Sequence, residues 1–375
     1  NTSGKPYVIY KTVKGFDLFT DFSKKIILNK NNIHHFLNKK KLRKKSKDTD
    51  LFIGFFGYEL LNNLIGIKIP KQKNINFPKG IFYKPEKRIE LTNNLNYKTE
   101  ISRLNNKFEL NINKNSYTKI FNKFKKKIKS GETYQIKICT KYKTNSNIDP
   151  LDFFCRLSKS NLAPEAFMIR DKNYSIISCS PENLITKKGS LITTKPIAGT
   201  VKKTMNMNKK KALQYFKNNL KETKEHNMIV DMERNDLSRI CKVGTVILSK
   251  EKIVEEYKDL FHYVSLIQGK VKKNIKNIDI IKAMMPGGSV IGCPKINTLN
   301  LLNKQEKENR NVYTGSFGYI KFNGDMRFNI IIRSIINFKN ISEISVASGV
   351  VIDSNPQHEF YENYIKAKAL IDLYK

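Results

Sequence analysis

The chain of 375 residues is long enough to bury a substantial core, as one large domain or two. Its hydrophobic content of 39% lies far above that of disordered proteins and excludes an unfolded chain. The formal net charge is +37, but lysine enrichment runs through the whole sequence, so it indicates compositional drift and does not predict a dedicated nucleic-acid surface.

Five cysteines are scattered singly, without the paired spacing of disulfide frameworks or zinc sites. They indicate reduced thiols in a cytoplasmic protein. The apolar runs are shorter than a membrane-spanning segment, and no signal-peptide pattern opens the sequence. We therefore expect no membrane association.

Residues 1–112 predict a short, divergent N-terminal part. Residues 1–50 are weakly patterned and end in a basic segment. The apolar run Leu51–Leu61 predicts a buried strand that leads into a turn or helix start. Pro70–Pro85 is typical of a loop, and the alternation over Glu90–Ile112 predicts strands at a sheet edge.

Residues 113–375 are more strongly patterned and predict a second, catalytic domain. Apolar residues between Tyr117 and Ile128 fall on one helical face, and Gly131 ends that helix. Alternation over Tyr134–Cys139 predicts a strand that presents Gln135 on its second face.

The central stretch Ser180–Thr200 predicts a hairpin. It follows a predicted strand, Tyr174–Cys179, and turns at Lys187–Ser190. Glu182 stands at its entrance, and a proline and glycine bend stands at its exit. An ordinary surface hairpin and a hairpin that brings two chemical positions together both remain open from this stretch alone.

The remaining elements follow the same two periodicities and together predict an α+β fold with large antiparallel sheets. In chain order they are a helix over Lys209–Val230, strands over Thr245–Leu248 and Val264–Gln268, a helix over Ile278–Met285, a glycine-rich loop over Pro286–Gly292, a helix from Pro294, a hairpin over Tyr319–Ile332 around Asn323-Gly324, a strand over Ile344–Ile352 and a helix over Glu359–Tyr374.

Two pairs of glutamates have metal-site spacing. Glu222 and Glu225 are three residues apart on one predicted helix, and Glu359 and Glu362 are three apart on another. Each pair therefore shares a helix face, and two such faces would form an oxygen-rich site suited to Mg²⁺. Solvated glutamates that face abundant lysine are the alternative.

Three further polar residues stand in apolar surroundings or on an acidic helix face. Arg333 lies within the run FNIIIRSIINF, where a guanidinium either grips a substrate carboxylate or forms a buried ion pair. Lys366 shares a helix face with Glu362, so it either neutralises a second carboxylate or pairs with that acid. His262 is a candidate proton carrier or a satisfied core histidine.

Taken in order, the motifs of residues 117–375 resemble the chorismate-utilising enzymes, component I of aminodeoxychorismate synthase and of anthranilate synthase. The motifs are SPE (Ser180–Glu182), PIAGT (Pro196–Thr200), EHNMIVDMERNDLSR (Glu225–Arg239), HYVS (His262–Ser265), PGGSVIGCPK (Pro286–Lys295), YTGSFGYI (Tyr313–Ile320), IIIRS (Ile330–Ser334), VIDS (Val351–Ser354) and YENYIKAKAL (Tyr361–Leu370). The resemblance implies sheets packed as a sandwich with helices outside.

The resemblance also implies roles for individual residues. Mg²⁺ is held at the positions of Glu225 and Glu362, with Glu222 and Glu359 nearby, and the metal holds the ring carboxylate of chorismate. The other carboxylate is bound at Arg333, Lys366 and the backbone amides near Gly349, with further substrate contacts at Gly315 and Thr200. His262 lies beneath the ring, and Glu182 is the acid that serves in loss of the C4 hydroxyl.

The resemblance further implies the attacking nucleophile. Family members that use water carry a lysine where this chain has Gln135, so the chain resembles the users of ammonia. The sequence has no Gly-x-Cys-x-Gly or Gly-x-Ser-x-Gly motif of a nucleophile elbow. We therefore expect ammonia to come from a separate glutamine amidotransferase subunit.

The identity of the product remains open between the aminodeoxychorismate synthase branch and the anthranilate synthase branch of the family that the chain resembles. Ala198 stands where well-known aminodeoxychorismate synthases carry a lysine that attacks the ring, and is the anthranilate synthase form. PGGSVIGCPK and DMERNDL resemble the aminodeoxychorismate branch, which serves 4-aminobenzoate and folate synthesis, and we favour that branch. If a lysine replaces the absent one, Lys195 is a candidate. A polyanion-binding protein on a decayed enzyme scaffold is a remote alternative, suggested by the charge.

Overall fold

The computed structural model describes residues 4–38, 47–69, 77–91, 107–145, 148–160, 163–257 and 260–374. The first part of the chain forms β1 (Tyr7–Lys11), β2 (Phe16–Ile27), α1 (Ile33–Asn38), β3 (Leu51–Phe56), α2 (Tyr58–Leu64), β4 (Gly80–Leu91) and β5 (Glu109–Leu110). The middle forms α3 (Lys114–Lys129), β6 (Gln135–Thr144), α4 (Pro150–Ser160), β7 (Glu165–Arg170), β8 (Tyr174–Ser180), β9 (Asn183–Lys188), β10 (Leu191–Lys195), β11 (Ile197–Lys202), α5 (Lys209–Asn218) and α6 (Leu220–Ile240).

The last part forms β12 (Ile247–Glu256), β13 (Leu260–Lys270), α7 (Asn277–Met284), the 3₁₀ turn η1 (Gly288–Val290), β14 (Gly292–Cys293), α8 (Lys295–Gln305), β15 (Ser316–Lys321), β16 (Met326–Ile330), β17 (Ser334–Phe338), β18 (Ile341–Val350) and α9 (Pro356–Tyr374). Among the described residues, no helix combines the length and the apolarity needed to cross a bilayer.

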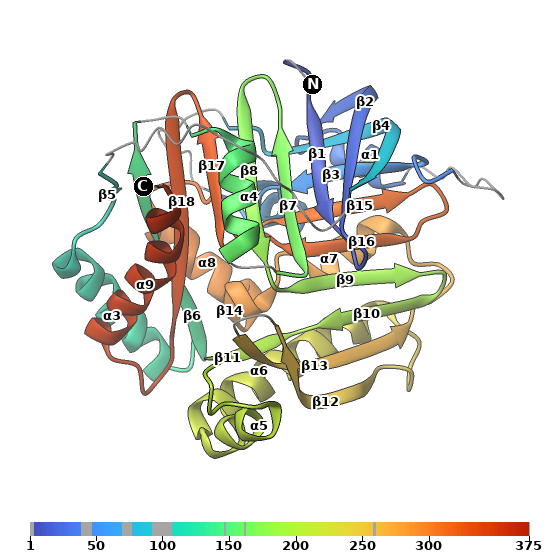
Figure 1. Cartoon of the computed structure of the whole chain (residues 1–375). Helices are drawn as coiled ribbons and strands as arrows, with labels where there is room; N and C mark the ends of the chain where they lie inside the picture. Colours follow the sequence, from blue (N-terminus) through green and yellow to red (C-terminus); the bar gives the residue numbers. More distant parts are fainter. Residues whose placement is uncertain are drawn as a thin grey trace.

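Antiparallel pairing joins the described strands into one continuous curled sheet (Figure 1). One half runs through β6, β18, β17, β8, β7 and β1. β2 pairs with β1 on one side and with β4 on the other, and so leads into the second half. That half runs through β4, β3, β15, β16, β9, β10 and β13, with β11 and β12 paired to β13.

The two halves pack face to face. Because the side chains of a strand alternate between its two faces, one strand contributes to the core between the halves and to a core on the outer face. In β1, Val8 and Tyr10 belong to a core that also contains residues of β3, β4, β15 and β17, whereas Tyr7 and Ile9 belong to a core with α4 and α9. In Figure 1 the strands of the first half run up and down the view, and those of the second half run across it. The expected sandwich with helices outside is confirmed.

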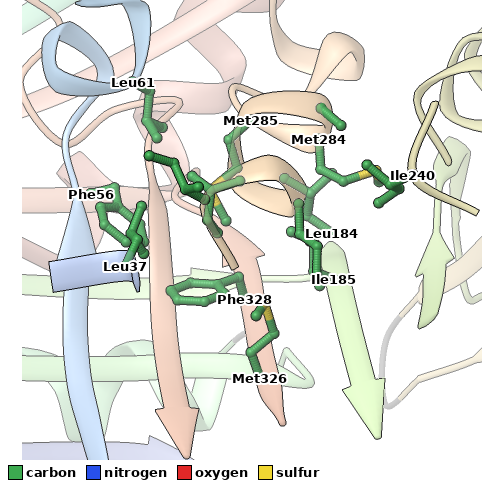
Figure 2. Packing of buried hydrophobic residues seen from close by; sticks show 14 of the residues in the cluster. Leu37, Phe56, Leu61, Leu184, Ile185, Ile240, Met284, Met285, Met326 and Phe328 are labelled. Carbon is green, nitrogen blue, oxygen red and sulfur yellow. The ribbon is translucent and has the colours of Figure 1, made fainter. Parts of the chain in front are cut away.

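A third core lies on the other face of the second half (Figure 2). Helices α1, α2, α6 and α7 cover strands β9, β10 and β16 there. Phe328 of β16 is fully buried, and its ring centroid lies 5.4 Å from that of Phe56 and 6.3 Å from that of Phe82. This packing fixes the position of α6, which carries part of the candidate site.

Strands on either side of the predicted boundary after residue 112 are hydrogen-bonded to each other. β1 pairs with β7, β3 with β15, and β5 with β6. The N-terminal part therefore contributes strands to the sheet that also carries the candidate site.

Several sequence expectations are confirmed. The predicted helix beginning near residue 113 is α3, whose N-cap Asn113 accepts a hydrogen bond from the backbone amide of Ser116 at 2.9 Å. Gly131 follows it with φ +77°, the left-handed conformation that ends helices. The hairpins around Lys187–Ser190 and Asn323-Gly324 are β9–β10 and β15–β16.

Other expectations are wrong. The single helix expected over Lys209–Val230 is two helices, because Asn219 leaves helical geometry between α5 and α6 and caps α6. Of the loop expected over Pro70–Pro85, residues 70–76 lie outside the described part of the chain, and the part from Gly80 onward is strand β4. Pro85 is tolerated there because β3 pairs with β4 only as far as Tyr83. Of the strands expected over Glu90–Ile112, residues 92–106 lie outside the described part of the chain.

We predict that Phe328→Ala lowers the free energy of unfolding by about 3–5 kcal/mol, because it removes a fully buried ring and leaves a cavity beside Phe56 and Phe82. Urea titration followed by circular dichroism measures this loss. The fully exposed Val13→Ala is the matched control and should leave the midpoint unchanged. Equal midpoints for both variants would contradict the packing described here.

Candidate active site

A cavity of about 390 Å³ opens where α6 and α9 meet strands from both halves of the sheet. Its walls combine acidic, basic and small residues from segments that are far apart in the sequence. They are Lys137, Glu182, Ile197, Ala198, Gly199, Thr200, Glu222, Glu225, Ile229, Ser289, Val290, Tyr313, Ile332, Arg333, Ser345, Val346, Ala347, Glu362 and Lys366.

The first turns of α6 present acids to the cavity because their spacing matches the helix. Glu222 and Glu225 lie three residues apart, and Ile229 follows one turn later on the same face. Asn219 fixes the start of this helix, since its side chain accepts a hydrogen bond from the backbone amide of Glu222 at 3.2 Å. The helix start therefore places the acids.

Cations lie among these acids. Oε1 of Glu225 accepts hydrogen bonds from Lys137 Nζ at 3.0 Å and from Gln135 Nε2 at 2.8 Å. The charge of Lys137 is the largest influence that lowers the pKa of Glu225 to about 2. On α9, Nζ of Lys366 lies 2.6 Å from Glu362. The pairing of Lys366 with Glu362, one of the two open alternatives for this lysine, is thus present.

The other two predicted metal ligands carry raised pKa values. Burial, reinforced by a neighbouring acid, raises the pKa of Glu222 and of Glu359. Oε1 of Glu359 is buried and, within the described part of the chain, accepts no hydrogen bond; Nζ of Lys221 lies 3.7 Å from it. One ligand atom each of His358, Glu359 and Glu362 lies within 4.8 Å of the others. A buried carboxylate oxygen without a donor fits a hard divalent cation.

Glu182 lies at the cavity between β8 and β9 and is only 5% exposed. Its Oε1 accepts a hydrogen bond from Ser289 Oγ at 2.7 Å. Burial raises the pKa of Glu182 to about 7, although this hydrogen bond acts in the opposite direction. Near neutral pH the carboxyl is therefore part protonated and part ionised, which suits a group that gives or takes a proton.

Arg333 brings a guanidinium to the same cavity from the link between β16 and β17. Its φ of +50° is rare for a residue with a side chain and is held only where the surrounding structure requires it. Burial lowers the pKa of Arg333, the charge of Glu182 acts in the opposite direction, and among the described residues no carboxylate lies within salt-bridge distance of the guanidinium. The alternative of a buried ion pair thus finds no partner there, and the guanidinium is available to an anion.

Lys366 and the two predicted substrate-binding glycines differ in their positions. Lys366 lines the cavity and donates to the carbonyl oxygen of Ala347 at 3.0 Å. Gly349 lies behind the wall, where an added Cβ would be 2.7 Å from Lys137 Nζ. Gly315 is not brought to the wall; a Cβ there would be 2.2 Å from the carbonyl oxygen of Phe56, so close packing requires this glycine.

His262 reaches the cavity through Thr200. Its Nδ1 lies 2.8 Å from Thr200 Oγ1, and the two residues are paired across β11 and β13. Burial lowers the pKa of His262 to about 4, so the ring is neutral near pH 7. Ala198 lines the cavity two residues before Thr200, whereas Lys195 is held by Glu255 at 2.6 Å and is not brought to the wall.

The sequence interpretation missed Lys137 as a site residue. It lies two residues after Gln135 on β6, so the alternation that presents Gln135 presents Lys137 on the same face. Among so many lysines, one more on a strand carried no distinguishing signal. Its contact with Glu225 depends on the approach of α6 to β6, which a local pattern does not encode.

We predict that Glu182→Gln stabilises the protein in a pH-dependent way. Because burial raises this pKa from 4.5 to about 7, the ionised carboxyl costs folding free energy increasingly as the pH rises through that window, and the cost is constant above it. The difference in unfolding free energy between variant and wild type should grow by up to about 3 kcal/mol between about pH 5 and about pH 8. Urea titrations at both pH values measure it.

The exposed Glu251→Gln is the control and should give no such growth. A difference between Glu182→Gln and wild type that stays constant with pH would contradict the buried environment of Glu182.

Comparisons with known proteins identify the family of the chain. The family described as chorismate binding enzyme matches residues 5–372. A Bacillus subtilis (strain 168) protein named aminodeoxychorismate synthase component 1 is 34% identical over 264 residues, which are 70% of this chain and 56% of that protein. An anthranilate synthase component I-like protein of Synechocystis sp. (strain ATCC 27184 / PCC 6803 / Kazusa) is 30% identical over 347 residues, 85% of this chain and 72% of that protein.

The crystal structure of anthranilate synthase component I from Streptococcus pneumoniae TIGR4 has the same fold, with a TM-score of 0.79 at 24% identity over 97% of this chain and 89% of that one. The chain thus spans about 56% of the length of the Bacillus subtilis relative but shares the architecture of the solved protein almost throughout. Since the family match extends over nearly every residue, the chain belongs to the chorismate binding enzymes.

Proposed function

We propose that the chain is component I of an aminodeoxychorismate synthase, which converts chorismate and ammonia into 4-amino-4-deoxychorismate and water. The observation that carries the chorismate part is the guanidinium of Arg333, which has no salt-bridge partner among the described residues and shares a cavity with Glu182 and the glutamates of α6 and α9. The Bacillus subtilis relative of that name supports the aminodeoxychorismate branch.

The glutamates are proposed to hold Mg²⁺, with Glu225 and Glu362 as ligands and Glu222 and Glu359 nearby. The oxygen-only character of these four side chains and the donor-free Oε1 of Glu359 support this choice. When bound, the ion supplies positive charge for the ring carboxylate of chorismate.

The chain's own residues then position the substrate and move its proton. Arg333 binds the enolpyruvyl carboxylate through two hydrogen bonds. Lys366, which lines the same cavity, and the backbone amides near Gly349 are proposed as further contacts of this carboxylate. Glu182 in its protonated form gives its proton to the departing C4 hydroxyl, which leaves as water. The neutral ring of His262 orients the hydroxyl of Thr200.

Ammonia is proposed as the nucleophile because Gln135 has no ionisable amine to activate water. A separate glutamine amidotransferase subunit would supply it. In the wall of the cavity Ala198 offers no amine either, and Lys195 is held by Glu255. The amines of Lys137 and Lys366, which do line the cavity, are paired with Glu225 and Glu362. Direct attack by ammonia on the ring is therefore the simplest reading of this site.

A second candidate is component I of anthranilate synthase, which converts chorismate into anthranilate and pyruvate. Ala198 favours it, because the small side chain packs against Ile229 and Met232 and leaves no attacking group at that position. The Synechocystis relative and the solved Streptococcus pneumoniae protein bear anthranilate synthase names, which supports the same alternative.

We predict that the purified full chain consumes chorismate when Mg²⁺ and an ammonium salt are both present. Liquid chromatography with mass detection identifies the product. 4-Amino-4-deoxychorismate is the expected result, and anthranilate with pyruvate would transfer the assignment to the second candidate. Chorismate left unconsumed, while a known aminodeoxychorismate synthase works in the same mixture, would refute both.

We predict that Arg333→Lys raises the KM for chorismate by roughly 10- to 100-fold, because lysine keeps the charge and loses the two-point grip. Steady-state kinetics at saturating Mg²⁺ separates this effect from a change in kcat. The exposed Arg234→Lys is the control, since it makes the same exchange outside the cavity. An unchanged KM for Arg333→Lys would show that the guanidinium does not bind substrate.

A further inference from the structure

Lys137 lies among the carboxylates of Glu222, Glu225 and Glu362, which line the cavity and are called the carboxylate cluster below. Its side chain is 14% exposed, and its Nζ donates to Oε1 of Glu225 at 3.0 Å. Gln135, two residues earlier on the same strand face, donates to the same oxygen at 2.8 Å. Two donors from β6 therefore meet one oxygen of α6.

The surrounding backbone makes room for this ammonium and fixes its strand. An added Cβ at Gly349 would lie 2.7 Å from Lys137 Nζ, so the glycine on the neighbouring strand β18 leaves room for the ammonium in its present position. Nη2 of Arg310 donates to the carbonyl oxygen of Lys137 at 3.0 Å and is 2.6 Å from Glu306. Since Arg310 is 1% exposed, this anchor is rigid.

Lys137 differs from the other lysines that neutralise the cluster. The side chains of Lys221 and Lys366 are 53% and 45% exposed, so water can solvate their charges when they leave their acids. The ammonium of Lys137 has far less access to water and stays near Glu225. Its charge acts at short range and with weaker screening.

We propose that Lys137 is an internal counter-cation that weakens the binding of divalent metal at this cluster. The proposal rests on the proposed function, because it takes the glutamates as metal ligands. A metal ion on Oε1 of Glu225 must displace the ammonium from that oxygen. A metal ion on Oε2 leaves the ammonium beside it, where like charges repel. Both arrangements lower the metal affinity, so Lys137 is a positioning residue that sets how much metal the protein needs.

Isothermal titration of the full chain with MnCl₂, without substrate, tests this. Removal of the charge in Lys137→Met should tighten Mn²⁺ binding by roughly tenfold. Lys137→Arg keeps a cation on the strand and should bind Mn²⁺ as the wild type does. Lys143→Met is the matched control, because Lys143 lies on the same strand and pairs with Glu308 away from the cavity.

An affinity of Lys137→Met equal to or weaker than that of the wild type overturns the proposal, as does an equal gain in Lys143→Met. Absence of Mn²⁺ binding in every form also overturns it. Circular dichroism verifies folding, and Lys137→Gln replaces the methionine variant if that one does not fold. The chorismate product assay is independent of this test. Product formation together with an unchanged Mn²⁺ affinity in Lys137→Met would contradict this inference without contradicting the proposed function.

Discussion

Acidic side chains from two helices converge in one cavity, and their mutual repulsion is the constraint on which the site depends. Glu222 and Glu225 of α6 and Glu362 of α9 line the cavity, and Glu359 of α9 lies next to Glu362. Like charges this close are tolerated only when cations stand among them or when some of them take up protons. Lysines lie among these acids and lower the pKa of Glu225 and Glu362, while burial and a neighbouring acid raise the pKa of Glu222 and Glu359.

The fold makes this convergence possible by bending one antiparallel sheet into two facing halves. Lys137 comes from the half that holds β6 and β18, whereas His262 and Thr200 come from strands at the end of the other half. Glu182 and Arg333 sit in the links that join strands across the sandwich. The carbonyl oxygens of both residues still accept backbone hydrogen bonds, from Ile330 at 3.1 Å and from Cys179 at 3.2 Å, while their side chains line the cavity. The positive φ of Arg333 belongs to this change of direction.

The sequence predicted those parts that local periodicity and turn chemistry determine. Helix α3, the hairpins around Gly189 and Gly324, and the sharing of a face by Glu222 and Glu225 are set by residues a few positions apart. Strands β1, β2, β7 and β17 were missed, since their identity depends on pairing partners that lie far away in the sequence. Lys137 was missed for the same reason, and the proximity of Glu182 to Ser289 required the packing of η1 against β9. Helix α4 was also missed, although its buried residues Phe153, Phe154 and Leu157 follow a helical spacing.

Anomalous scattering from Mn²⁺ in crystals of the full chain tests the central claim, that the two glutamate pairs form one metal site inside the substrate cavity. The account predicts a single strong peak between the carboxylates of Glu225 and Glu362. A peak held by His358 and Glu359 away from Glu225, or none in crystals whose protein binds Mn²⁺ in solution, would contradict it.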